Sequence, residues 1–222
     1  MGLPEPVDGQ GPRFFGVYPA LVTQLYGDPD KLGRVQVRFP SLGTDGDNDV
    51  RAWATLCSPY ADADQGFQVR PEKDSQVVVA FEAGDFRRPY IVGAAWNGTT
   101  PLPDEPKAAN NIRVLRTRAD SRLEFDDTAA APKVGITMKA GHKVVLDEGT
   151  QEITIAHKGG CTITLTATAV EITANTEVSI TAPELNVNAA TSNFSGVVNC
   201  TTLNASVGIT SPLYSPGVGN IW

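Results

Sequence analysis

The stretch from Gly159 to Trp222 contains no lysine and no arginine. It consists largely of short runs in which apolar residues alternate with Thr, Ser, Asn or Glu. Four such runs follow one another at intervals of seven or eight residues: Ile163–Leu165, Val170–Ile172, Val178–Ile180 and Leu185–Val187. Alternation with a period of two is typical of β-strands that have one apolar face. Regular repetition on this scale predicts a stacked or wound β structure.

This tract is too poor in apolar side chains to fold as one copy. Ordering about 60 residues costs on the order of 60–120 kcal/mol of conformational entropy. About a dozen apolar side chains, each contributing roughly 1.5–3 kcal/mol when buried, fall well short of that cost. Stacked strands also leave unpaired edges, which invite another chain. The pattern therefore predicts a closed symmetric oligomer, and a three-faced prism with a narrow apolar interior favours three copies.

Composition excludes several classes of function. The net charge of −7 argues against a nucleic-acid partner or an anionic membrane surface. No apolar run approaches the length of a membrane span. The first residues, Met1 to Gly16, lack the layout of a secretory signal, so we expect assembly in the cytoplasm. The three cysteines, Cys57, Cys161 and Cys200, are too scattered for a disulfide framework or a zinc site.

The N-terminal half predicts a small barrel. After a flexible leader over 1–13, strands are expected near residues 17–26, 34–39, 50–57, 76–82 and 90–95, separated by turn-rich loops. Five strands with no convincing amphipathic helix fit a partly open barrel of the OB type over 14–98. A proline-rich linker over 99–110 follows it. Further strands are expected in the tract over 111–210, and a segment over 211–222 ends the chain. The predicted fold class is all-β.

The order of residues in the barrel resembles a known family. Leu32-Gly-Arg-Val-Gln-Val-Arg-Phe-Pro40 is followed by Trp53, by Gln65-Gly-Phe67, by Val77-Val-Val-Ala-Phe-Glu-Ala-Gly-Asp85 and by Arg88-Pro-Tyr-Ile-Val-Gly93. This order resembles the OB domain of contractile-tail spike proteins, which include phage baseplate assembly protein V and the VgrG-type spikes. The repetitive tract after it is similar to the intertwined triple-stranded β-helix of the family's homotrimers.

The resemblance implies a central spike of a contractile tail or injection-system baseplate, which attaches to a trimeric hub and pierces the target envelope on sheath contraction. Only about 15 residues precede the barrel, so the hub is expected to be a separate protein. Other baseplate proteins and a conical tip protein of the PAAR type are further expected partners, and contact with the target cell envelope is expected to be transient. The protein would be assembled in the cytoplasm and then form part of a virion tail or injection particle.

Two sets of residues are predicted to carry this function. The first set would form the dry interior shared by three copies, and the second set would receive the tip protein. The predicted trimer core is Ile153, Ile155, Ile163, Leu165, Ile172, Val178, Ile180, Leu185, Val187 and Leu203. The predicted tip-docking residues are Tyr214, Val218, Ile221 and Trp222.

Catalytic and cofactor chemistry has little support in the residues. The two histidines, His142 and His157, do not form a nucleophilic triad, a metal-ligand spacing or the His-x-His apex of some phage spikes. Asp45, Asp47 and Asp49 have calcium-loop spacing, but the following positions lack the Gly and Glu that such loops require. We therefore expect no enzyme activity, no metal and no cofactor.

Two other functions remain as alternatives to the spike. One is a trimeric β-helical adhesin or tailspike that binds or cleaves surface polysaccharide, which would need a groove lined by carboxylates and aromatics. The other is a nucleic-acid-binding OB protein, which would need a basic groove with stacking aromatic residues. Residues 1–106 contain nine Lys and Arg against fifteen Asp and Glu, so the second alternative is disfavoured.

Overall fold

The computed structural model describes residues 13–43 and 49–211 of the chain. The described residues contain fourteen β-strands and one helical element, the single 3-10 turn η1 (Glu82–Gly84). The all-β prediction is therefore confirmed. Among the described residues, no helix is long and apolar enough to cross a membrane. The chain divides into two compact units, Met1–Asn175 and Thr176–Trp222.

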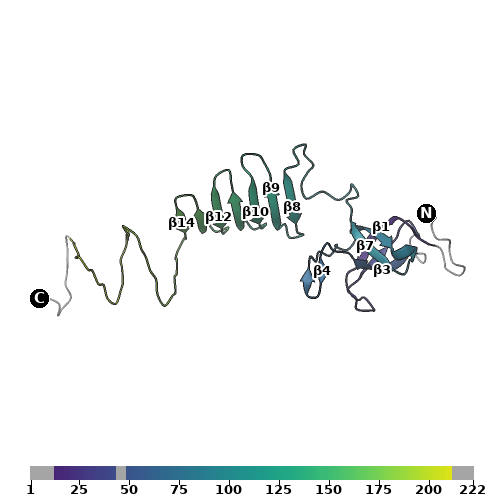
Figure 1. The fold of residues 1–222 in the computed structure, drawn as a ribbon, viewed down its shortest axis with the longest axis horizontal. Helices are drawn as coiled ribbons and strands as arrows, with labels where there is room; N and C mark the ends of the chain where they lie inside the picture. The colour runs from purple at the N-terminus through teal and green to yellow at the C-terminus, as the bar shows by residue number, and fades with distance from the viewer. Residues whose placement is uncertain (1–12, 44–48, 212–222) are drawn as a thin grey trace. The chain divides into compact units, whose positions relative to one another are not determined.

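A closed barrel forms the first part of unit 1 (Figure 1). Its strands are β1 (Val17–Gln24), β2 (Val35–Arg38), β3 (Arg51–Leu56), β6 (Gln76–Phe81) and β7 (Pro89–Ala94). The order around the barrel is β1-β2-β3-β7-β6, with β3 and β7 parallel and the other pairs antiparallel. These strands match the five that the sequence predicts. A two-stranded hairpin of β4 (Ala61–Asp62) and β5 (Gln65–Gly66) was not predicted.

Alternation within these strands builds the barrel interior. Val35, Val37, Val77 and Val79 are completely buried, while their neighbours along β2 and β6 face outward. Ten buried hydrophobic residues of the described chain form this core: Ala20, Val22, Val35, Val37, Phe39, Ala54, Val77, Val79, Phe81 and Ile91. The barrel therefore buries a complete hydrophobic core within one copy of the chain.

Two local features fix the loops of the barrel. The Asp28 carboxylate accepts hydrogen bonds from the backbone N–H groups of Leu32 and Arg34, and it forms an ion pair of 2.7 Å with the Arg34 guanidinium. The guanidinium holds the pKa of the Asp28 carboxyl well below its usual range. Gly84 has a positive φ of 80°, and a Cβ there would lie 3.2 Å from the backbone nitrogen of Phe14. Glycine is thus the residue that this turn can accommodate.

Phe39→Ala is predicted to destabilise the barrel strongly. The Phe39 ring is fully buried and packs against Phe81 and Phe86 at centroid distances of 5.5 Å. Removing a buried phenylalanine costs about 3–5 kcal/mol. The thermal unfolding transition of the barrel, followed by near-UV circular dichroism, should move to a much lower temperature. Phe67→Ala is the matched control because Phe67 is 53% exposed, and an equal shift for both variants would contradict the assignment of the core.

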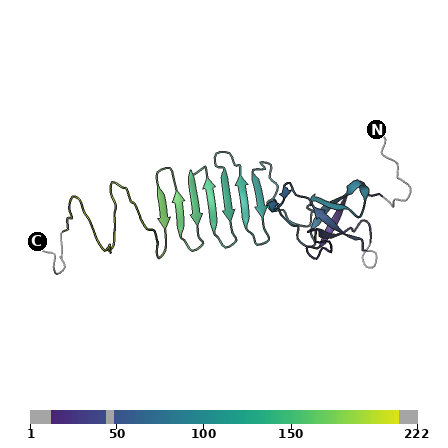
Figure 2. The ribbon, with the colours of Figure 1, turned by 60° about the horizontal axis from the view of Figure 1, so that its bottom comes forward.

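A seven-stranded antiparallel sheet follows the barrel along the chain (Figure 2). Each strand pairs with the next one in sequence, so the spatial order is β8 to β14 without a crossover. The strands are β8 (Ile112–Arg116), β9 (Arg122–Asp126), β10 (Lys133–Thr137), β11 (Lys143–Asp147), β12 (Glu152–Ala156), β13 (Thr162–Leu165) and β14 (Val170–Thr173). Hydrogen bonding over this region lies within one chain.

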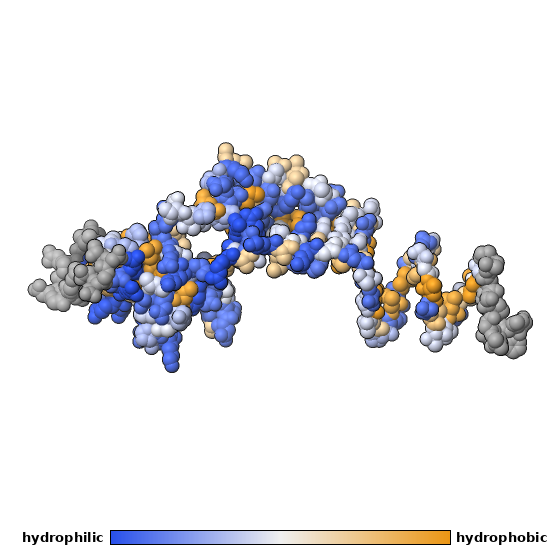
Figure 3. Space-filling model, turned by 180° about the vertical axis from the view of Figure 1, so that it is seen from behind, coloured by the Kyte–Doolittle hydropathy of each residue, from blue (hydrophilic) through white to orange (hydrophobic). Residues whose placement is uncertain are grey.

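Unit 2 contains no strand within its described part, Thr176 to Ser211. The strands predicted at Val178–Ile180 and Leu185–Val187 are thus not formed by a single chain. These segments are exposed, and Val178 and Ile180 have 54% and 66% of their surface accessible. A strand needs a hydrogen-bonded neighbour, and the described residues of one copy offer none here. In Figure 3 apolar residues nevertheless recur along this unit, with polar residues between them.

Candidate functional site: an uncovered apolar face

The register of the sheet places its apolar side chains on one face. Directly opposed residues of neighbouring antiparallel strands point to the same side. Ile155 is opposed by Val144 on β11 and by Ile163 on β13, and Ile163 is opposed in turn by Ile172 on β14. One continuous ladder across the seven strands is Leu115, Leu123, Ile136, Val144, Ile155, Ile163 and Ile172.

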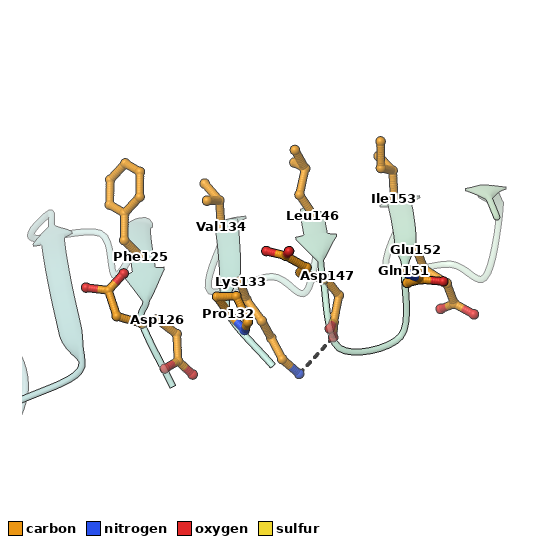
Figure 4. Close-up of a pocket in the computed structure, with 12 residues that line it drawn as sticks. Phe125, Asp126, Pro132, Lys133, Val134, Leu146, Asp147, Gln151, Glu152 and Ile153 are labelled. Atoms are coloured by element: carbon orange, nitrogen blue, oxygen red, sulfur yellow. Dashed lines mark ion pairs between the residues drawn. The ribbon is translucent and has the colours of Figure 1, made fainter. Parts of the chain in front are cut away.

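A second ladder runs beside the first on the same face. It consists of Arg113, Phe125, Val134, Leu146, Ile153, Leu165 and Val170. Figure 4 shows four of these side chains, Phe125, Val134, Leu146 and Ile153, pointing to the same side of the sheet. They form one wall of an open groove of about 440 Å³. The two ladders together hold thirteen apolar residues and one arginine.

No residue that the structure describes covers this face. Ten of its thirteen apolar side chains are exposed, among them Ile136 at 53% and Ile172 at 59%. Beyond Ile91 no described residue is buried at all. A monomeric soluble protein rarely exposes a contiguous apolar area of this extent, so such a face marks an interaction site.

The opposite face is mostly polar. Thr154, Thr164 and Glu124 lie there in one ladder, and Thr137, Lys143 and Thr162 lie in another. The contrast between the two faces follows directly from the period-two alternation in each strand.

One end of the strands carries a small charged network. Lys133 on β10 forms an ion pair of 2.8 Å with Asp147 on β11, and Figure 4 marks this contact with a dashed line. The Lys133 ammonium lowers the pKa of the Asp147 carboxyl, and hydrogen bonds from Thr128 lower the pKa of Asp126. Within the described residues, no group of three or more His, Cys, Asp or Glu is arranged to hold a metal ion.

The structure brings together half of the predicted trimer-core residues. Ile153, Ile155, Ile163, Leu165 and Ile172 lie on the uncovered face. The other five, Val178, Ile180, Leu185, Val187 and Leu203, are exposed in unit 2. The predicted tip-docking residues, Tyr214, Val218, Ile221 and Trp222, lie outside the described residues.

Sequence reasoning missed the first half of the face. Leu115, Leu123, Phe125, Ile136 and Leu146 share it with the predicted residues. Charged residues flank these positions, whereas the tract after Gly159 has few charges, and this difference obscured a common pattern. The same period-two alternation, counted strand by strand from Ile112 onward, would have revealed them.

A closed five-stranded barrel followed by a sheet with one uncovered apolar face defines a protein that associates through its β structure. Comparison with known proteins agrees with this class. Residues 18–96 match the type VI secretion system/phage-baseplate injector OB domain, and residues 133–193 match the phage baseplate V C-terminal trimerisation domain. These two matches, together with relatives of the VgrG type, support the contractile-tail spike family that the order of residues in the barrel resembles.

Curated relatives match about half of this chain. The type VI secretion system spike protein VgrG4b of Pseudomonas aeruginosa is 29% identical over 50% of this chain and 14% of its own length. The spike protein VgrG3 of Vibrio cholerae is 27% identical over 47% of this chain and 11% of its own length. The actin cross-linking toxin VgrG1 of Vibrio cholerae is 27% identical over 47% of this chain and 10% of its own length. The match thus spans a small part of each relative.

Proposed function

We propose that this chain is the structural central spike of a contractile tail or injection-system baseplate, and that it acts as a homotrimer. The observation that carries the proposal is the seven-stranded sheet in which no described residue is buried. Covering the surface that its thirteen apolar side chains leave exposed would contribute on the order of 10–20 kcal/mol per copy, as an upper bound. The match to a trimerisation domain supports three copies.

The mechanical role follows from shared burial. Three sheets that turn their apolar faces inward would form a prism with a dry interior, and each sheet keeps its own hydrogen-bonded strands. The segments of unit 2 would gain their hydrogen-bond partners from the other copies, since one copy gives them none. A shaft built in this way resists bending because splaying would expose the interior to water. We expect this part of the protein to act without catalysis.

Attachment and piercing belong to the same proposal. The barrels would form a collar on a trimeric hub, the shaft would be driven through the target envelope, and the segment over 211–222 would receive a conical tip protein. The named relatives support this role because two of them are described as type VI secretion spike proteins.

Labelling of assembled particles tests the proposed function. An antibody against the barrel should mark the baseplate on the tail axis in electron micrographs of contractile particles from the native host. Label on tail fibres or on the cell surface, with none on the axis, would overturn the spike and favour a polysaccharide-binding adhesin.

Removal of the last segment is predicted to separate assembly from tip binding. A chain that ends before Ser211 retains both ladders of the uncovered face and should still form trimers. It should no longer retain a PAAR-type tip protein in a pull-down assay. Retention equal to that of the full chain would place the tip site elsewhere.

A further inference from the structure

The ends of the strands and the turns that join them form two edges of the seven-stranded sheet, and these two edges carry opposite charge. One edge consists of the β8–β9, β10–β11 and β12–β13 turns with the strand ends that flank them, and we call it the basic edge. Its cations are Arg116, Arg118, Arg122, Lys139, Lys143 and Lys158, against the single carboxylate of Asp120. The other edge contains the β9–β10 and β11–β12 turns, and we call it the acidic edge. Its carboxylates are Asp126, Asp127, Asp147, Glu148 and Glu152, against the cations of Lys133 and of Arg113 near the start of β8.

Part of this charge is already neutralised within the chain. Arg113 pairs with Asp127, Arg116 with Asp120, Arg118 with Glu72, Arg122 with Glu124 and Lys133 with Asp147. Three lysines of the basic edge, Lys139, Lys143 and Lys158, form no ion pair with any described residue. The same holds for Glu148 and Glu152 of the acidic edge, among the residues that the structure describes.

These unpaired groups lie at opposite ends of the same strands. β11 begins at Lys143 and is followed at its other end by Glu148. β12 begins at Glu152, and Lys158 follows its other end. Five residue steps of extended chain separate Lys143 from Glu148 by about 16 Å. That distance exceeds the screening length of about 10 Å at 0.1 M salt, so the two charges of one copy scarcely interact.

The charges discriminate between ways of covering the apolar face. Rotation about an axis along the strands would stack two sheets with the basic edge of one on the basic edge of the other. Rotation about an axis along the stacking direction of the strands brings each strand end to end with the same strand of the next copy. Only the second arrangement places the basic edge of one copy against the acidic edge of its neighbour, and its contacts are head-to-tail around a closed ring.

We propose that the copies of this chain are joined at the corners of the prism by ion pairs between these edges, with Lys143 facing Glu148 and Lys158 facing Glu152 of the next copy. This inference rests on the proposed trimer. The apolar faces supply most of the association free energy, whereas the edges select parallel copies at the same level. Such pairs weaken with ionic strength, as exposed ion pairs do.

A charge swap in the full-length chain tests the proposal. Lys143→Glu and Glu148→Lys are each expected to accelerate trimer dissociation about ten-fold at low ionic strength, because three corners are affected in every trimer. The double variant is expected to return to the wild-type rate. Dissociation would be followed by native mass spectrometry after mixing with isotopically labelled trimers, at low and at high salt. Glu152→Lys, Lys158→Glu and the variant that combines them form a second, independent double-mutant cycle.

The matched control combines Lys143→Glu with Glu171→Lys. Glu171 lies in the middle of β14 on the polar face, opposed by Thr164, and should not restore the rate. If the double variants of both cycles show the combined acceleration of their two single variants, with no rescue, the edge pairing would be overturned. The proposal of a trimer would still stand. A wild-type chain that is monomeric would instead overturn the proposed function. Since the two charges of one chain are too distant to couple, rescue in either cycle would identify a contact between copies.

Discussion

Replacing Ile155 by aspartate is expected to leave the chain unable to form trimers. Ile155 lies at the centre of the first ladder, between Val144 and Ile163, and it is 46% exposed in one copy. In the trimer its side chain would be enclosed, and an unpaired carboxylate there would cost several kcal/mol in each of three copies. Sedimentation equilibrium at micromolar concentration should give the mass of a monomer.

Thr154→Asp is the matched control for this variant. Thr154 is the neighbouring residue of β12 and belongs to the opposite, polar face, where it is opposed by Val145 and Thr164. It introduces the same charge into the same strand and should leave the trimer intact. Normal trimers from Ile155→Asp would show that this face is not the interior, and loss of trimers from both variants would indicate damage to the strand itself.

A chain that ends at Pro106 is expected to fold as a stable monomer. All ten residues of the buried hydrophobic core lie between Ala20 and Ile91, so the barrel keeps its whole core after the truncation. The uncovered face, which begins at β8, is removed completely. The truncated chain should unfold in one cooperative transition, followed by circular dichroism, and should sediment as a monomer.

The reciprocal outcome would move the site of assembly. A robust trimer formed by residues 1–106 alone would show that the barrels associate directly and that the sheet is not needed for trimer formation. Failure of the fragment to fold would show that the closed core is insufficient. Phe39→Ala, made in the same fragment, distinguishes a genuine folding transition from residual structure because it should lower the midpoint sharply.

Much of the barrel was predictable from sequence because its signals are local. Val35, Val37, Val77 and Val79 alternate with outward-facing residues, and Gly33 and Gly84 occupy turns with positive φ. The β4–β5 hairpin was missed because each of its strands has only two residues and both are exposed. Strands this short leave no periodic pattern.

The uncovered face was predicted only in part. The isoleucines from Ile153 to Ile172 stood out because few charges surround them, whereas Leu115, Phe125 and Leu146 are flanked by charged residues. The strands expected at Val178–Ile180 and Leu185–Val187 are absent from a single copy. The alternation of apolar and polar residues shows that a segment is able to form a strand. The strand forms only when a neighbouring strand supplies its hydrogen-bond partners.

The sequence by itself determined the all-β class, the five strands of the barrel and the need for several copies, because alternation and apolar content are properties of the chain alone. Only the tertiary structure decided which residues share a face and which charges share an edge. That information lies in the register between strands: a shift of one residue would turn Ile155 to the opposite side of the sheet. The pairing of β12 with β11 on one side and with β13 on the other fixes this register, and the register places the thirteen apolar residues on the uncovered face.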